Sequence, residues 1–238
     1  MASKSQSSSK TSPSPFGSDL FPFLAELGLN NERDWFMENK ARYESSVREP
    51  ALEFIRQMAP KLAKISKHFQ AIDKKTGGSL MRVNRDVRFS KNKEPYKTNV
   101  GIQFRHEAGK DVHAPGFYLH IEPGSVFVGI GMWHPEASAL KAVRDHIVDA
   151  PAAWKKARDD AGFRKYFELG GESLKRPPRG FDADHPYIED LLRKDHIAMC
   201  ELKGSAVSKP GFVELVADHF AAAKPYVKFL GKALDLPI

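Results

Sequence analysis

Basic side chains concentrate in residues 82–97, where six lysines and arginines stand against two acidic residues. Three of the arginines recur at every third position, and two of the lysines follow them on either side of a Pro-Tyr pair. Guanidinium groups offer forked donors that match phosphate or carboxylate oxygens, and ammonium groups add point charge. We therefore predict a site for a compact anion, built from Arg82, Arg85, Arg88, Lys93 and Lys97.

Two further residues belong to this predicted site. Asp86 is placed to pin one arginine, and Tyr96 to shape the wall. The competing interpretation is a solvated loop whose arginines pair for structural reasons with acids such as Asp73, Asp86 and Glu94. If the site is catalytic, the arginines stabilise developing negative charge and Asp86 or His120 carries the proton. The residues alone name no reaction, so whether the protein is an enzyme stays open.

The net charge of +7 makes nucleic acid the second hypothesis for the partner. In that case residues 82–97, the cluster Lys175-Arg176-Pro-Pro-Arg179 and the lysines near the N-terminus form one positive face, on which Tyr96 or Phe89 stacks bases. Focal basic clusters favour a compact anion over a long backbone. A third hypothesis is a partner-binding module that uses the Pro-rich loop 177–186. The oligomeric state cannot be predicted.

Other chemistry has weaker support in the sequence. Nine histidines include no metal-binding spacing, and the nearest candidate is His120 with Glu122, joined by His134, Asp182, Asp184 or His185. We expect no metal. Gly129-x-Gly131 lacks the third glycine of a dinucleotide fingerprint, and neither a phosphate-binding Gly-rich loop nor a Gly-x-Ser-x-Gly elbow occurs, so we expect no cofactor. Cys200 lies in an apolar stretch and is interpreted as a buried side chain.

The apolar pattern predicts an α+β fold. Helical spacing covers most of the first third, with one stripe at Ala51, Ile55, Met58, Leu62 and Ile65 before which Pro50 is expected to interrupt the helix. Alternation then predicts strands over 100–105, 117–122 and 126–132, the last two joined by the turn Glu122-Pro-Gly-Ser125. A weaker strand is expected over 196–202, and helices return towards the C-terminus. We expect a mostly antiparallel central sheet flanked by helices.

Composition predicts how the chain is divided into a tail and a folded domain. Residues 1–18 hold eight serines and little apolar content, which predicts a disordered tail, with a transit peptide as the alternative. Residues 19–238 are predicted to form a single α+β domain. No apolar run is long enough for a membrane helix, and the one cysteine has no partner in the chain, so we expect a cytoplasmic protein without membrane contact.

Four motifs stand out along the chain: Asn30-Asn31-x-x-Asp34-Trp35-Phe36 with Asn39-Lys40 and Tyr43, Arg85-Asp86-x-Arg88-Phe89, Lys93-x-Pro95-Tyr96-Lys97-Thr98, and Leu174-Lys-Arg-Pro177 with Gly180-Phe181-Asp182 and His185-Pro186. Together they resemble the conserved hypothetical proteins grouped as domain of unknown function 2461. The resemblance spans residues 19–203. It implies one cytoplasmic domain whose marked residues include the same arginines and aromatics, and it supplies no catalytic residue.

Overall fold

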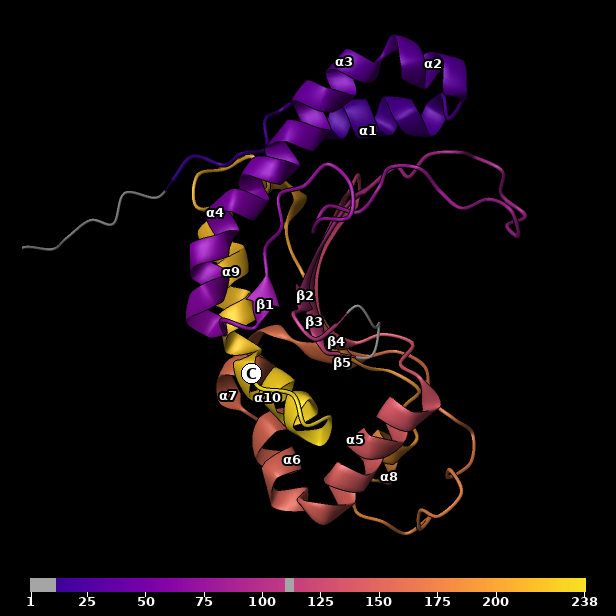
Figure 1. The fold of residues 1–238 in the computed structure, drawn as a ribbon, viewed down its shortest axis with the longest axis vertical. Helices are drawn as coiled ribbons and strands as arrows, with labels where there is room; N and C mark the ends of the chain where they lie inside the picture. The colour runs from indigo at the N-terminus through magenta and orange to yellow at the C-terminus, as the bar shows by residue number, and fades with distance from the viewer. Residues whose placement is uncertain (1–11, 110–113) are drawn as a thin grey trace, which may run out of the picture.

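The computed structural model describes residues 12–109 and 114–238 (Figure 1). The N-terminal third is helical, as predicted. Its helices are α1 (Leu20–Leu29), α2 (Arg33–Glu38), α3 (Lys40–Tyr43) and α4 (Glu49–Ile65), with a π-helical turn at Glu44–Arg48 joining the last two. The remaining helices are α5 (Ala137–Asp149), α6 (Pro151–Arg158), α7 (Ala161–Tyr166), α8 (Ile188–Leu191), α9 (Phe212–Ala222) and α10 (Lys224–Ala233).

A six-stranded sheet with the order β1-β2-β3-β4-β6-β5 forms the centre, and every pairing is antiparallel. Its strands are β1 (Phe69–Gln70), β2 (Val100–His106), β3 (Gly116–Glu122), β4 (Ser125–Met132), β5 (Glu168–Gly170) and β6 (His196–Glu201). The predicted hairpin is confirmed, because β3 and β4 pair from Gly116↔Gly131 to Glu122↔Ser125. The predicted α+β class is confirmed as well.

The two faces of the sheet differ in what they carry. On the inner face Phe104 and Phe117 are buried and both contact Phe220 of α9, so the helices cover this side. Helices α4, α9 and α10 lie along it in Figure 1. The opposite face, here called the outer face, carries alternate residues of the same strands. Its members include Gln103, Tyr118, His120, Phe127, Gly129 and Met199.

Some local predictions need correction. The predicted tail reaches too far, because Phe16 is 1% exposed and packs against Phe54 and Phe212. Ser14 Oγ also donates a hydrogen bond to the carbonyl of Val207 over 2.6 Å. The prediction for residues 1–11 lies outside the described residues. Pro50 does not interrupt the helix; it is the second residue of α4 and follows directly on the π-helical turn Glu44–Arg48.

Strands β1 and β5 were not predicted, because two or three residues are too few to show an alternation. Among the described residues, no helix has both the length and the apolar character needed to cross a bilayer.

Candidate functional site

The basic segment forms an extended loop that precedes β2 in the chain and leads into that strand. Asn84 and Tyr96 form an isolated antiparallel bridge, with hydrogen bonds from Arg85 N to Pro95 O and from Lys97 N to Val83 O, both 2.8 Å. We call residues 82–97 the basic loop. It projects beyond the helices and sheet at the upper right of Figure 1. The loop therefore has two strand-like arms that fix its base.

Two contacts with the N-terminal helices anchor this base. The Tyr96 ring is 6% exposed and stacks on Phe36 with 4.1 Å between ring centroids. Asn31 donates from Nδ2 to Tyr96 O and accepts from Tyr96 N, each over 3.0 Å. Tyr96 is therefore an anchor of the loop. We predicted that its ring shapes the wall of a site, but the ring is buried against Phe36 instead.

The outer part of the loop contains two ion pairs. Arg88 binds Asp86 through both guanidinium Nε and Nη2, at 3.0 and 2.7 Å, and these hydrogen bonds lower the pKa of Asp86. Arg85 Nη1 lies 3.3 Å from Glu94 Oε2. Both pairs are partly or largely exposed, so each contributes little to stability. The predicted pinning of an arginine by Asp86 thus appears in the structure, at Arg88.

Three lysines and one arginine complete the loop's positive charge. Lys93 Nζ donates to the carbonyl of Val87 over 3.0 Å, and Lys91 is exposed. Arg82 and Lys97 form no salt bridge with any described residue. Burial, and after it the positive charge of Arg82, lowers the pKa of Lys97. The structure therefore brings two cations without a salt bridge together at the base of the loop, although the charge of Arg82 also acts on Asp86 and, after the hydrogen bonds from Arg88, lowers its pKa.

The chain that follows Lys97 reaches a row of polar side chains on the outer face. Thr98 Oγ1 donates to Glu122 Oε1 over 2.7 Å, and Asn99 Nδ2 lies 3.4 Å from His120 Nδ1. His120 Nδ1 also lies 3.0 Å from the hydroxyl of Tyr118, and its Nε2 lies 3.2 Å from Glu122 Oε2. Three alternate residues of β3 thus form one hydrogen-bonded chain beside the basic loop.

The sequence analysis named His120 and Glu122 as candidate metal ligands and His120 also as a candidate proton carrier, but it missed Tyr118, Thr98 and Asn99. The signal for Tyr118 was present, since positions 118, 120 and 122 of a predicted strand lie on one face. The contacts of Thr98 and Asn99 depend on how the loop returns, which no local pattern predicts. Among the described residues, no group of three or more His, Cys, Asp or Glu side chains could hold a metal ion.

The other residues considered for a metal site lie elsewhere. His134 has a left-handed backbone with φ 47°, and its amide donates to Asp195 Oδ1 over 2.6 Å. Asp182 and His185 line a surface hollow of about 410 Å³ against α5. A larger hollow of about 680 Å³ lies between α6 and α10 and is lined by Lys156, Lys228 and Phe229, among others. The basic loop lines neither of these two hollows.

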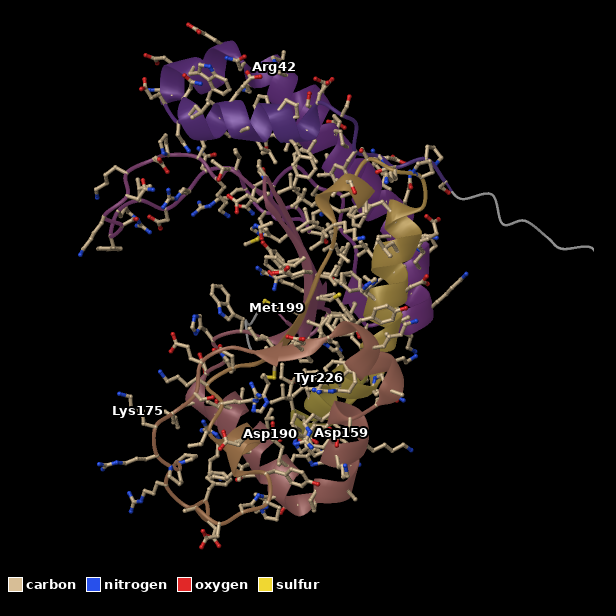
Figure 2. All side chains as sticks on the ribbon, turned by 180° about the vertical axis from the view of Figure 1, so that it is seen from behind. Arg42, Asp159, Lys175, Asp190, Met199 and Tyr226 are labelled. Atoms are coloured by element: carbon tan, nitrogen blue, oxygen red, sulfur yellow. The ribbon has the colours of Figure 1, made fainter. Side chains whose placement is uncertain are left out.

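Met199 of β6 lies on the outer face, opposite Gly129 of β4, and is labelled in Figure 2. Its side chain is 42% exposed, as Met81 is at 39%, so apolar groups flank the polar row. Gly101 lies opposite His120, and a Cβ there would meet Met81 Sδ and the Tyr118 hydroxyl at 2.9 Å. The Tyr118 hydroxyl therefore occupies the space above this glycine.

The comparison with protein families gives one match. The family described as "Conserved hypothetical protein (DUF2461)" matches residues 19–229, which is most of the chain and includes the basic loop and the outer face. No curated protein and no solved structure matches the chain.

Proposed function

We propose that this chain, which belongs to the DUF2461 family of conserved hypothetical proteins, binds a small molecule carrying a phosphate or carboxylate group at the base of the basic loop. The observation that carries the proposal is the pair Arg82 and Lys97, two neighbouring cations that form no salt bridge among the described residues. An anion between them relieves their repulsion and raises the pKa of Lys97 back towards its usual value.

The rest of the loop supports the same position for the anion. Arg85 and Arg88 are already paired with Glu94 and Asp86, so an anion at the tip would have to displace a carboxylate. The base is also held by Asn31 and by the buried Tyr96, which fixes the backbone that carries the two cations before binding. A preorganised site loses less conformational entropy when its ligand binds.

Isothermal titration with inorganic phosphate and with malonate tests the proposal. Arg82→Ala and Lys97→Met each remove one charge, and each is expected to weaken binding by about 10- to 100-fold, the value of a charged hydrogen bond. Lys91→Ala is the matched control, because it removes the same charge from an exposed position of the loop. Equal losses in the three variants, or no binding by the unmodified protein, would contradict the proposal.

Nucleic acid remains the second candidate because of one side chain at the tip of the loop. Phe89 is 94% exposed, and the Arg88 guanidinium lies 5.8 Å from its ring centroid. An exposed aromatic ring beside cations is the arrangement on which single-stranded bases stack. Fluorescence anisotropy with a mixed-sequence single-stranded oligonucleotide tests it, since Phe89→Ala should weaken binding about 5-fold or more and added salt should weaken it steeply.

The Phe89→Ala variant distinguishes small-anion binding from nucleic-acid binding. Phe89→Ala leaves phosphate binding unchanged if the anion lies at Arg82 and Lys97, because the tip takes no part in that site. Absence of oligonucleotide binding at low salt removes the nucleic-acid candidate and leaves the small anion.

A further inference from the structure

Tyr118, His120 and Glu122 form a continuous chain of hydrogen bonds on the outer face. The Tyr118 hydroxyl lies 3.0 Å from His120 Nδ1, and His120 Nε2 lies 3.2 Å from Glu122 Oε2. The side chains occupy alternate positions of β3, so the strand itself brings them to the same face. In this order the imidazole can act as a base towards the hydroxyl while the carboxylate orients the imidazole, which is the arrangement that activates a hydroxyl oxygen.

The Glu122 carboxylate assigns the protons in this chain. Its oxygens can only accept, so the His120 nitrogen that faces Oε2 carries the proton and Nε2–H donates to Glu122. Nδ1 of the neutral ring is therefore the acceptor that faces the Tyr118 hydroxyl. Burial, and after it the negative charge of Glu122, raises the pKa of Tyr118 to about 12. The phenol is consequently protonated at neutral pH and donates to His120.

Contacts from three sides hold the relay in place. The His120 imidazole stacks on the Phe127 ring of β4, with centroids 4.7 Å apart and planes at 13°. Thr98 Oγ1 binds the second oxygen of Glu122 over 2.7 Å. On the β2 side the neighbour is Gly101, which leaves room for the Tyr118 hydroxyl. The ring and the carboxylate are thus oriented before any ligand arrives.

We propose that Tyr118 is an acid–base residue that exchanges a proton with a hydroxyl group of a ligand on the outer face. As the ligand O–H bond breaks, its proton passes to Tyr118 O while the Tyr118 proton passes to His120 Nδ1. His120 becomes an imidazolium that Glu122 stabilises, the ligand oxygen gains the negative charge, and the reverse transfer restores both. The ligand class, a hydroxyl-bearing anion, rests on the proposed function, because Arg82 and Lys97 supply its anion site.

The relay can be tested without the natural ligand, because a sulfonyl fluoride reports removal of the phenolic proton. Phenylmethanesulfonyl fluoride and Tyr–OH give a sulfonate ester: the new O–S bond replaces the S–F bond, fluoride leaves as an anion, and His120 accepts the phenolic proton. Mass spectrometry of the full chain measures the rate at each tyrosine. We expect Tyr118 to react at least about tenfold faster than Tyr187, which is also partly buried, and His120→Gln to abolish that difference.

The controls separate the relay from a structural role and from the anion site. His134→Gln removes a histidine remote from Tyr118 and should leave the rate unchanged, and Tyr118→Phe identifies the labelled peptide. Lys91→Ala should also leave it unchanged, because this exposed lysine belongs neither to the relay nor to the anion site. A Tyr118 rate no greater than that of Tyr187, or a rate that His120→Gln leaves unchanged, overturns the relay even if phosphate binds at Arg82.

A pH profile of the unmodified protein decides the question if His120→Gln does not fold. The titratable groups facing His120 are Tyr118 and Glu122 of β3, while β2 and β4 present Gly101 and Phe127, with Glu201 of β6 beyond. With the relay, the Tyr118 rate rises with deprotonation of one histidine and then levels off. A rate that instead climbs continuously towards the pKa of a phenol overturns the proposal.

Discussion

Asn31 binds the backbone of Tyr96 twice, as donor to its carbonyl and as acceptor from its amide, with both distances 3.0 Å. The two residues are 65 positions apart, and the side-chain amide imitates the edge of a neighbouring strand. These hydrogen bonds attach the helical N-terminal third to the basic loop. The loop that carries Arg82 and Lys97 therefore depends on a residue remote in sequence.

Replacement of this amide should weaken both the fold and the anion site. Asn31→Ala leaves the Tyr96 amide and carbonyl without their partner, which costs about 1–3 kcal/mol in the free energy of unfolding. Urea denaturation measures that loss, and phosphate titration of the folded variant measures the effect on the site. Asn30→Ala is the control, since its Nδ2 makes one exposed hydrogen bond, to Glu26 O. Equal losses in the two variants would show that Asn31 is no special anchor.

The sequence predicted the sheet well because its strands alternate over seven or eight residues. In β3, Phe117, Leu119 and Ile121 face the helices, so the polar row on the opposite side follows from the same pattern. It also located the basic loop from charge alone. It could not predict which cations remain unpaired, because that depends on short contacts such as Arg88 with Asp86. The buried position of Tyr96 depends on Phe36, a contact across the fold.

Gly131 should tolerate no side chain, although sequence reasoning considered it only as part of a cofactor motif. Its φ is +105°, and a Cβ there would lie 2.0 Å from the carbonyl oxygen of His196 on β6. Gly131→Ala must therefore distort the β4–β6 pairing, and we expect a loss of about 1–3 kcal/mol or more in unfolding free energy. Gly129→Ala is the matched control, since its Cβ meets other atoms only at 3.9 Å or beyond. Similar stabilities of the two variants would contradict this reading of the strand.

Asp190 holds a buried polar cluster near α8, below the sheet in Figure 2. Its carboxylate accepts from Trp154 Nε1 over 2.7 Å and binds Arg158 Nη1 at 2.8 Å, while only 3% of the residue is exposed. Asp190→Ala leaves these donors unpaired in the interior, which should cost about 3–5 kcal/mol. The control Asp159→Ala also removes a partner of Arg158, but from a more exposed pair, and should cost about 1 kcal/mol or less. Chemical denaturation compares the two, and equal costs would contradict the buried role of Asp190.

His196 should make the protein less stable in mild acid. The residue is wholly buried against Trp154, and neither ring nitrogen has a hydrogen-bond partner among the described residues. Burial, followed by the charge of Arg193, lowers its pKa to about 3. The unfolded chain takes up a proton at this histidine below pH 6.5 and the folded chain does not. The contribution of His196 to the free energy of unfolding is therefore fully present above pH 6.5, and it falls by about 1.4 kcal/mol per pH unit towards pH 3.

Urea denaturation of the unmodified protein and of His196→Leu between pH 7 and 4.5 measures this effect. The variant lacks the titrating group, so its stability should depend less steeply on pH. Parallel pH profiles for the two proteins would show that His196 is protonated in the folded state and would contradict the assignment.

The most direct test of the anion site is an NMR titration of the full chain with inorganic phosphate, following the Lys97 Nζ and Arg82 Nε signals. We predict saturable shifts at these two side chains and a rise in the pKa of Lys97 as phosphate fills the site, with the Arg88 and Lys91 signals nearly unchanged. Shifts spread evenly over every cation of the loop, or none at Arg82 and Lys97, would contradict it.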